Sequence, residues 1–447
     1  MSFQEEVDAF LGAHPDIEVV EVLLSDMNGI LRMKQASPAV LKKIAKGAFT
    51  LPASVSYLSV TGDTLDCTLS DLGSDPDRLC VAVPGSLQMV PWAKRPTAQV
   101  LITMRELDGS PWFMDPRCIL EKTLSFYHDA GLKPVVAFEY EFYLLEKGAM
   151  PPRPVSPMSG MPHATGANYL TAEVHYDFAI ILDEIEAACR VQGIPIDALL
   201  CEYGDGQFEV NLNHMDDALM ASDYALLLKR VVKCVAFRHD MLASFMAKPL
   251  PDQSGNGLHA HMSILNADGD NIFGLADGEA KLAAAVGGLL KAMPESTAIF
   301  APTANSYRRF DPELYTPVVP NWGENNRRVS VRLPVSDKTN RRFEHRVSGA
   351  DACPHLVLAA ILAAAHYGLT HDCDPGTKLG ELDDIDMSNM LPSRWGRSNA
   401  AFKDGDILSE YLGERFMDLY QRIRSEEEEI YHRLISQTDL DWYLRVV

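Results

Sequence analysis

Apolar residues recur at helical spacing in some segments of the chain and alternate with polar residues in others, so both helices and strands are expected. Helical spacing predicts helices at residues 3–13, 39–46, about 117–130, 171–192, 216–247, 280–293, 354–370 and 414–435. Strand-like patterns are expected over much of residues 16–107, around Glu139, around His259, and at 327–334 and 341–346. Residues 148–163 and 305–320 are expected to be irregular, and the Glu-rich run 425–429 is expected to be a solvated helix face.

The distribution of these patterns predicts two domains. One helix interrupts the strand-like residues 16–107, and prolines then punctuate the chain up to Pro116. We therefore expect a small α+β domain over residues 1–110 and a larger domain over residues 111–447.

Composition limits the classes of protein to consider. A chain of 447 residues with 47% hydrophobic content can bury a large core. Its formal net charge of -22 argues against nucleic acid or an anionic membrane as the main partner. No apolar run approaches the roughly 20 residues of a membrane span, and the acidic N-terminus does not resemble a signal peptide. The 8 cysteines are scattered without a Cys-x-x-Cys pair, which favours reduced thiols and a cytoplasmic location.

Ionisable side chains spaced two residues apart are the strongest chemical signal. Residues i and i+2 of a strand point to the same face, so each set would project its groups to one side. A Gly-Asp-Gly turn would bring a further pair of carboxylates together on adjacent short strands. Carboxylates, imidazoles and interleaved guanidinium groups of this kind indicate a site for hard cations and an anionic ligand. The groups are Glu139 with Glu141, His259 with His261, Arg342 with Glu344 and Arg346, and Glu202 with Glu209.

Each of these features also has a structural interpretation. Glu139 and Glu141 could lie solvated on an edge strand, although their apolar neighbours predict a buried one. A histidine on a strand is often only hydrogen-bonded, but a glycine loop at residues 255–257 precedes His259 and suits close approach to a small ligand.

Arginines are concentrated between residues 308 and 346 of this acidic chain. They could form surface ion pairs, but the planar guanidinium group is also suited to phosphates and carboxylates. The G-x-x-x-x-G-K-[ST] and G-x-G-x-x-G motifs are both absent, so a nucleotide would have to bind in another fold.

In its ordered set of motifs, the chain resembles the glutamine synthetase family. The resemblance implies an α+β fold, with an N-terminal β-grasp domain and a catalytic α/β domain built on a curved antiparallel sheet, a half-barrel. The matching motifs are Phe-Glu-Tyr-Glu-Phe-Tyr, Glu-Tyr-Gly-Asp-Gly-Gln-Phe-Glu, Gly-Asn-Gly-Leu-His-Ala-His-Met-Ser, Asn-Ser-Tyr-Arg-Arg, Asn-Arg-Arg-Val-Ser-Val-Arg-Leu-Pro and Arg-Phe-Glu-His-Arg, over about residues 135–370.

The resemblance also implies a role for each matching residue. Mg²⁺ or Mn²⁺ would be the metal, and ATP and L-glutamate would be substrates. One metal would be held by Glu141, Glu202 and Glu209, and the second by Glu139, His259 and Glu344. ATP would contact His261, Ser263, Arg332 and Arg342, and Arg327 would lie over the transferred phosphoryl group. Glutamate would contact Gly255, Arg309 and Arg346, with Arg309 and Arg327 as catalytic residues.

Departures from the family pattern bear on the amine substrate. Ammonia-using members carry a Glu where this chain has Tyr315, and an Asp in a stretch that here reads Ser54–Tyr57. Because an ammonium ion without a carboxylate is unfavourable when desolvated, we expect an alkylammonium ion that contacts Tyr315, with Tyr57 as a further candidate. Ser254 replaces an Asn of the glutamate-binding loop, and we expect Asn256 to compensate.

The sequence therefore predicts an ATP-dependent glutamate–amine ligase that acts through γ-glutamyl phosphate, with a polyamine such as putrescine as the acceptor. The C-terminal Asp441–Leu444 segment also resembles the γ-glutamylpolyamine branch of the family. The alternatives are a γ-glutamylmethylamide synthetase using methylamine, a glutamine synthetase using ammonium, a guanidino kinase of related fold, and an inactive structural homologue. The resemblance further implies a homo-oligomer, a dodecamer of two hexameric rings.

Overall fold

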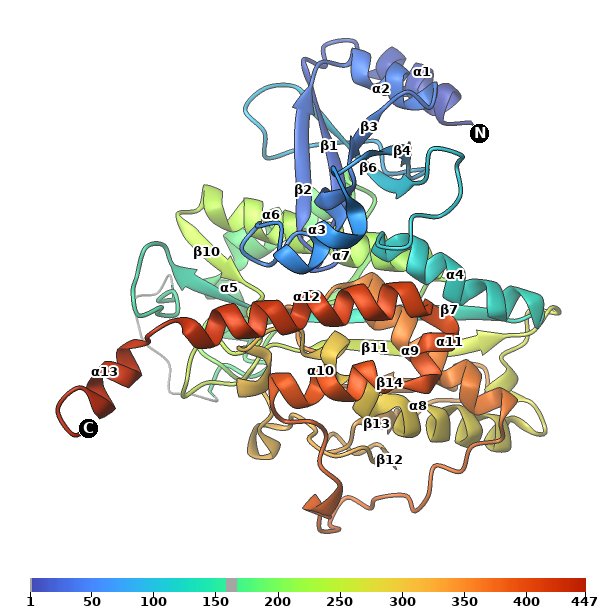
Figure 1. Cartoon of the computed structure of the whole chain (residues 1–447), viewed down its shortest axis with the longest axis vertical. Helices are drawn as coiled ribbons and strands as arrows, with labels where there is room; N and C mark the ends of the chain where they lie inside the picture. The colour runs from blue at the N-terminus through green and yellow to red at the C-terminus, as the bar shows by residue number, and fades with distance from the viewer. Residues whose placement is uncertain (1, 158–166) are drawn as a thin grey trace.

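The structure is a computed structural model that describes residues 2–157 and 167–447. It contains two β-sheets that follow one another along the chain, one in residues 19–105 and the other in residues 133–345. Figure 1 shows the first sheet at one end of the molecule, and the second within the larger body. The predicted mixed α/β fold is confirmed, whereas the predicted domain boundary at residues 110 and 111 stays a prediction.

The first sheet has the strand order β2-β1-β6-β4-β3, with β5 paired to β6. Its central strand β6 carries an almost continuous buried run, while no residue of the edge strand β2 is buried. That contrast is expected when only the middle of a sheet is covered on both faces. The elements of this region are α1 (Phe3–Ala13), β1 (Val19–Ser25), β2 (Leu31–Ala36), α2 (Ala39–Ala45), β3 (Thr50–Pro52), η1 (Ala53–Ser56), α3 (Asp66–Leu72), β4 (Asp77–Ala82), β5 (Gln88–Met89) and β6 (Thr97–Arg105).

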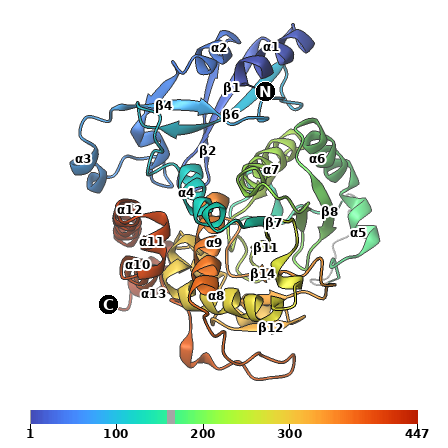
Figure 2. The ribbon, with the colours of Figure 1, turned by 90° about the vertical axis from the view of Figure 1, so that its right-hand side faces the viewer.

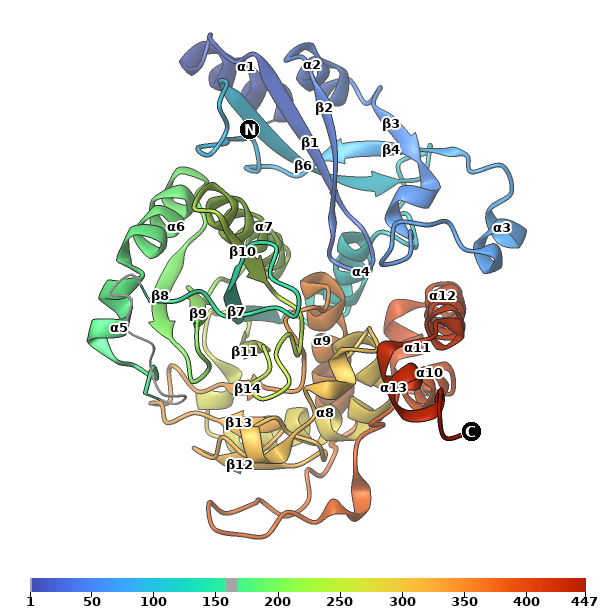
Figure 3. The ribbon, with the colours of Figure 1, turned by 90° about the vertical axis from the view of Figure 1, so that its left-hand side faces the viewer.

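The second sheet has the order β12-β13-β14-β11-β7-β9-β8, with β10 also paired to β7. All of its pairings are antiparallel except β12 with β13. Figures 2 and 3 show this sheet curled, with helices on its outside, which confirms the predicted half-barrel. Its strands are β7 (Lys133–Glu146), β8 (Ile196–Cys201), β9 (Gln207–Leu212), β10 (Met241–Ser244), β11 (Leu258–Leu265), β12 (Trp322–Glu324), β13 (Val331–Leu333) and β14 (Phe343–His345).

Helices cover the outside of this curved sheet, and α9 is almost completely buried among them. That burial agrees with the uniformly apolar sequence of α9, because a helix surrounded on all sides needs no polar face. The helices are α4 (Pro116–Asp129), α5 (Ala172–Asp177), α6 (Ala179–Val191), α7 (Ala218–Arg238), α8 (Gly278–Phe300), α9 (Pro354–Thr370), α10 (Trp395–Lys403), α11 (Asp406–Leu412), α12 (Glu414–Arg433) and α13 (Gln437–Tyr443), with short 3₁₀ turns at Ile272–Gly274 (η2), Ser306–Arg308 (η3), Pro312–Leu314 (η4) and Met387–Asn389 (η5).

The start of α4 shows how local sequence signals join the two sheets. The Asp115 carboxylate accepts hydrogen bonds from the N–H groups of Arg117 and Cys118, and Pro116 occupies the first helical turn. The other oxygen of Asp115 accepts from the Met104 N–H of β6 at 2.6 Å. One N-cap residue therefore starts the helix and attaches it to the first sheet.

Several predicted helices have the correct bounds, whereas other predicted helices and strands begin, end or divide at different residues. The helices predicted at residues 3–13, 39–46, 117–130, 354–370 and 414–435 are confirmed to within about two residues. The helix predicted at 171–192 is two helices that meet at Phe178, and the one at 216–247 ends at Arg238, after which the chain turns into β10. The helix predicted at 280–293 continues through Pro294 to Phe300. The predicted strand 327–334 is short, since only Val331–Leu333 is extended. Residues 148–157 are irregular as expected, and the rest of that predicted loop, 158–163, lies outside the described residues.

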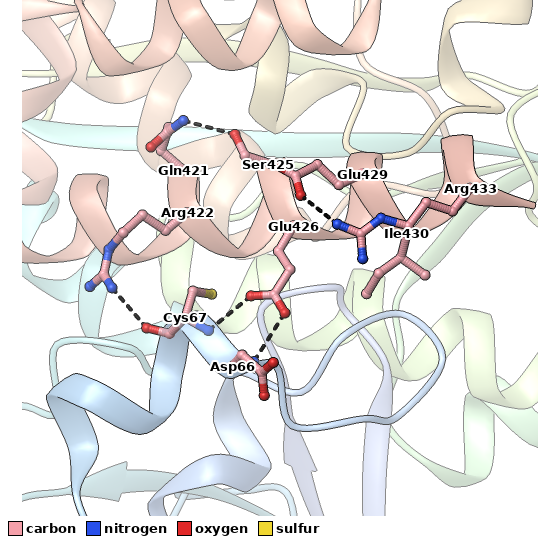
Figure 4. A pocket seen from close by; sticks show the side chains of 9 residues that line it. All are labelled: Asp66, Cys67, Gln421, Arg422, Ser425, Glu426, Glu429, Ile430 and Arg433. Atoms are coloured by element: carbon pink, nitrogen blue, oxygen red, sulfur yellow. Dashed lines mark hydrogen bonds and ion pairs between the residues drawn. The ribbon is translucent and has the colours of Figure 1, made fainter.

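The acidic run of α12 is solvated only in part, contrary to the sequence prediction, since Glu427 is buried and Glu429 is exposed. Glu426 accepts hydrogen bonds from the N–H groups of Asp66 and Cys67, at 3.0 and 2.9 Å, at the start of α3. Arg422 of the same helix donates to the Cys67 carbonyl at 2.7 Å. These contacts border a hollow of about 520 Å³ between α3 and α12 (Figure 4). The run therefore attaches α12 to the first-sheet region.

A buried ionic network strengthens this attachment. The Arg424 side chain, 1% exposed, donates to Glu427 at 2.7 Å and to the Asn28 side-chain oxygen at 2.8 Å. The other Glu427 oxygen accepts from the Val60 N–H at 2.7 Å. The guanidinium also lies 4.7 Å from the centre of the Tyr420 ring. Removing one partner from such a network leaves an uncompensated buried charge.

No helix within residues 2–157 and 167–447 is long and apolar enough to span a membrane.

We predict that Arg424→Met lowers the free energy of unfolding by about 3–5 kcal/mol, because it leaves the Glu427 carboxylate buried without its cation. Urea denaturation measures the change. Arg433→Met on the same helix is the control, since Arg433 pairs with Glu429 at the surface and its loss is expected to cost less than about 0.5 kcal/mol. Equal stability losses in the two variants would contradict a role for the buried network.

Candidate active site

The register of the second sheet places the predicted ionisable residues in rows on one face. Glu139 of β7 lies opposite His259 of β11, and Glu141 lies opposite Glu209 of β9. A further row runs from His261 to Glu344 of β14 and on to Arg332 of β13. Residues that face one another across strands have Cβ atoms about 5 Å apart, so register alone converts the sequence spacing into a cluster.

Two groups within this cluster could hold a cation. The ligand atoms of Glu139, His259 and Glu344 lie within 4.8 Å of one another. The same is true of Glu141, Glu209 and His259. The first group is the set predicted for one metal. The second has His259 where Glu202 was predicted, and Glu202 belongs to neither group.

Opposite charges stabilise the ionised form of the carboxylates at one end of the cluster. Glu344 is 1% exposed and accepts hydrogen bonds from Arg346 and, at 2.8 Å, from Arg332. Burial raises the pKa of Glu344, but the opposing causes, of which the charge of Arg346 is the largest, outweigh it and bring the pKa to about 2. Burial also raises the pKa of Glu139, and hydrogen bonds to His259 and His261 hold it well below its usual range. These two groups are therefore anionic.

The other end of the cluster has an excess of negative charge. Burial, followed by the charge of Glu141, raises the pKa of Glu202 to about 8. Burial and the charges of Glu139, Glu141 and Glu202 raise the pKa of Glu209 well above its usual range. Within the described part of the chain, no ion pair joins Glu202 or Glu209 to a cationic side chain. An oxygen-rich donor set with one imidazole and unbalanced negative charge fits Mg²⁺ or Mn²⁺.

His261 connects this cluster to the arginine-rich segment. Its Nε2 lies 2.9 Å from a Glu139 oxygen, and Arg342 donates from Nε to its Nδ1 at 3.2 Å. This arrangement fixes the tautomer, because Nδ1 must accept and Nε2 must carry the proton toward Glu139. Ser263 follows on the same strand with the same parity, so it shares the face of His261.

Arg309 packs beneath the glycine loop. It donates to the carbonyl of Val347 at 2.8 Å, and its buried Nε has no hydrogen-bond partner. A Cβ on Gly255 would lie 2.6 Å from Arg309 Cγ, and one on Gly257 would lie 2.8 Å from Nη2. The loop therefore needs glycine at both positions, and the unpaired Nε–H is a donor that a carboxylate could use.

Other predicted residues lie outside the cluster. Arg327 is exposed in the turn before β13, and no hydrogen bond or ion pair between it and the cluster is seen among the residues described. Tyr315 is 61% exposed and has a left-handed backbone, φ +57°, which is uncommon for a non-glycine residue. Tyr57 is 2% exposed in the core of the first-sheet region, so the expectation that its ring face meets an amine is wrong.

Asn256 does not compensate for Ser254 in the way expected. Its side chain is completely buried and donates to the carbonyls of Ser244 and Met246 at 3.3 and 2.9 Å. Both amide hydrogens therefore already have acceptors, and none remains for a glutamate carboxylate.

Two groups were missed from the sequence, one beside the cluster and one in the first-sheet region. The ring of His214 lies 6.1 Å from that of His261, and its only signal was a position shortly after the Glu209 strand. Asp75 accepts hydrogen bonds from the N–H and hydroxyl of Ser54 at 2.8 and 2.7 Å. The fold thus places a carboxylate beside the acid-free stretch Ser54–Tyr57, which nothing in the local sequence indicated.

Comparisons with known proteins agree with this geometry. The family model described as "Glutamine synthetase, catalytic domain" matches residues 113–443. The chain is 38% identical to the gamma-glutamylputrescine synthetase PuuA of Escherichia coli (strain K12), over 99% of this chain and 95% of that protein. It is 28% identical to a glutamate–isopropylamine ligase of Pseudomonas sp., over 99% of this chain and 98% of that protein.

The fold also matches solved structures over nearly its whole length. A structure described as a GmaS/ADP complex superposes with a TM-score of 0.83 at 26% identity, covering 98% of this chain and 99% of that one. The predicted resemblance is confirmed by the family match and by the length over which the relatives align: the chain belongs to the glutamine synthetase family, whose members are ATP-dependent carbon–nitrogen ligases.

Proposed function

We propose that this chain joins the γ-carboxylate of L-glutamate to an alkylamine, with a diamine of the putrescine type as the preferred acceptor. The observation that carries the proposal is the carboxylate and arginine cluster on one face of the curved sheet, in a chain 38% identical to a gamma-glutamylputrescine synthetase along its whole length. The ligase class follows from the family, whereas the choice of amine is our inference.

The proposed reaction has two steps. An oxygen of the glutamate γ-carboxylate forms a bond to the γ-phosphorus of ATP, and the bond to the β-phosphate oxygen breaks to give ADP and γ-glutamyl phosphate. The amine nitrogen then attacks the γ-carbonyl carbon, phosphate leaves, and the nitrogen loses a proton to give the amide. Both steps depend on positioning and on neutralising charge on phosphate oxygens.

Different residues of the chain would bind ATP, the transferred phosphoryl group and glutamate. Arg332, Arg342 and His261 line one side of the cluster and would bind the ATP phosphates, with Ser263 beside the nucleotide. The exposed Arg327 would reach over the transferred phosphoryl group. Gly255, Arg309 and Arg346 would hold glutamate, because they meet at the glycine loop.

Divalent cations would bind Glu139, His259 and Glu344 on one side and Glu141, Glu202 and Glu209 on the other. When bound, they would supply positive charge that offsets both the crowded carboxylates and the phosphates.

Tyr315 supports an alkylamine over ammonium. Its ring is exposed, and its strained backbone marks a position where strain is often functional. A ring face attracts a cation through its quadrupole, and burying each CH₂ of the amine adds roughly 0.8 kcal/mol. A carboxylate at the same position would instead favour a small bare cation.

A small monoalkylamine is the second candidate. The relative of Pseudomonas sp. that is 28% identical is named for isopropylamine, a branched amine with a single nitrogen. The same cluster would serve both substrates, and the amine pocket would distinguish them.

We further propose a ring-based homo-oligomer. The support is a C-terminal segment, containing α13, that projects from the body (Figure 1) and whose large apolar side chains are exposed. A surface of this kind usually marks a protein contact. Its exposed residues include Leu434, Ile435, Trp442, Leu444, Val446 and Val447.

We predict that Glu139→Gln lowers the rate of phosphate release by at least about 100-fold, because it removes one anionic ligand from the cluster. The assay combines glutamate, ATP, Mg²⁺ and putrescine with phosphate detection. Glu146→Gln is the control, since Glu146 lies on the same strand but pairs with Arg153 away from the cluster. Near-normal turnover by Glu139→Gln would contradict the metal assignment.

Steady-state kinetics with putrescine, isopropylamine, methylamine and ammonium test the choice of amine. We expect kcat/KM to be highest for putrescine, and to be at least about 10-fold lower for ammonium because it offers no apolar carbon to the ring face. A value for ammonium that equals those for the alkylamines would identify a glutamine synthetase instead.

Tyr315→Glu is expected to raise kcat/KM for ammonium relative to putrescine by about 10-fold or more, because a carboxylate replaces the ring face. Tyr315→Phe is the matched control, which keeps the ring and is expected to keep the preference. If Tyr315→Glu leaves the ratio unchanged, Tyr315 lies outside the amine site.

A further inference from the structure

Gln207 is the first residue of β9 and follows the Gly-Asp-Gly turn that carries Glu202. It is 2% exposed, and both the oxygen and the nitrogen of its side-chain amide have hydrogen-bond partners. Its Oε1 accepts from the Gly204 N–H at 3.0 Å, and its Nε2 donates to the Gly255 carbonyl at 3.0 Å and to the Asn256 side-chain oxygen at 3.1 Å.

These partners determine the orientation of the amide. A backbone N–H can only donate and a carbonyl can only accept, so the oxygen of Gln207 must face Gly204 and the nitrogen must face Gly255. The hydrogen bonds of Asn256 are consistent with this orientation of the Gln207 amide. The Asn256 nitrogen donates to two carbonyls at the end of β10, so its oxygen is free to accept from the Gln207 nitrogen. A relay therefore runs from the Glu202 turn through Gln207 and Asn256 to β10.

The two segments that Gln207 joins carry different parts of the site. On one side, the Glu202 N–H donates to the Gln207 carbonyl at 2.9 Å. On the other, Gly255 lies against Arg309, and the Gly257 N–H donates to a Glu141 oxygen at 2.6 Å. Gln207 is thus a bridge between the carboxylates of one proposed metal and the loop proposed for glutamate, beside the hydrogen bond from the Asp205 N–H to the Gln253 side-chain oxygen at 3.2 Å.

The space around the bridge leaves little room for rearrangement. A Cβ on Gly204 would lie 2.1 Å from the Tyr143 hydroxyl and 2.9 Å from Gln207 Oε1. That hydroxyl donates to the Ser254 carbonyl at 2.8 Å. Tyr143 and Gln207 therefore both hold the glycine loop, and both pack against the turn.

We infer that Gln207 is a positioning residue that fixes the Glu202 turn and the glycine loop in one arrangement, so that glutamate binding and divalent-cation binding depend on the same amide. The inference rests on the proposed function for the identity of the ligands. Leucine at this position would leave the Gly255 carbonyl and the Asn256 oxygen buried without donors. Glutamate would place a carboxylate against those acceptors and add negative charge to the acidic end of the cluster.

The test compares wild type with Gln207→Leu and with Gln207→Glu, which keeps the size and polarity of the side chain. We expect KM for glutamate to rise about 10-fold or more, and Mn²⁺ affinity, measured by calorimetry without ATP, to fall about 10- to 100-fold. KM for the amine and the circular dichroism spectrum are expected to stay near wild type. Gln192→Leu is the control, because Gln192 is also a buried glutamine but bonds to Gln99 and the Met89 carbonyl, away from the cluster.

Double substitution tests the relay itself. Gln207→Leu combined with Asn256→Leu is expected to raise KM for glutamate no more than the larger single effect, because both changes break one chain of bonds. If the double variant raises KM for glutamate by the product of the two single increases, the two side chains act independently and the relay is wrong. If both Gln207 variants keep the wild-type KM for glutamate and Mn²⁺ affinity, the inference itself is wrong. A wild-type enzyme that ligates no amine would instead overturn the proposed function, and the Mn²⁺ titration would still test Gln207 without turnover.

Discussion

The accumulation of carboxylates on one face of the curved sheet is the constraint on which the rest of the site depends. Glu139, Glu141, Glu202, Glu209 and Glu344 meet in partly or fully buried positions, where like charges repel strongly. Arg332 and Arg346 neutralise Glu344, and the two histidines hold Glu139 in its ionised form. The Glu202 and Glu209 end lacks such partners, and its raised pKa values show where a cation would contribute most. The protein thus concentrates unbalanced charge at one place.

Holding those charges in position requires a stiff frame around them. The antiparallel register fixes the rows of side chains, while buried amides fix the loops at their ends. Gln207 and Asn256 have no charge to contribute, yet they determine where the glycine loop and the Glu202 turn lie relative to each other. Polar groups buried with complete hydrogen bonding act in this way, because any other arrangement leaves an unpaired donor or acceptor.

The first-sheet region is attached to the body by a different kind of contact. Arg424 and Glu427 of α12 form a buried ion pair that reaches Asn28 and the Val60 N–H, and Glu426 caps α3. Helix α12 therefore fixes the position of the loop that leads from Ser54 to Asp66. That loop begins with the acid-free stretch Ser54–Tyr57, on which part of the amine prediction rested.

The sequence by itself determined the sheet residues of the site. Period-two spacing put Glu139 with Glu141 and His259 with His261 on one face of each strand, and the ordered motifs identified the family. Tertiary structure alone decided what lies beside each group. Because of the strand register, His259 belongs to both groups of possible metal ligands, whereas Glu202 belongs to neither. Folding also places Asp75 beside Ser54, which lies 21 residues away in the chain. The acidic run of α12 looked solvated because charge runs usually are, but Glu426 and Glu427 are bonded to backbone N–H groups of the distant residues Val60, Asp66 and Cys67. Spacing along a chain specifies which face a side chain takes, whereas its burial, partners and charge state depend on segments distant in sequence, which local patterns do not encode.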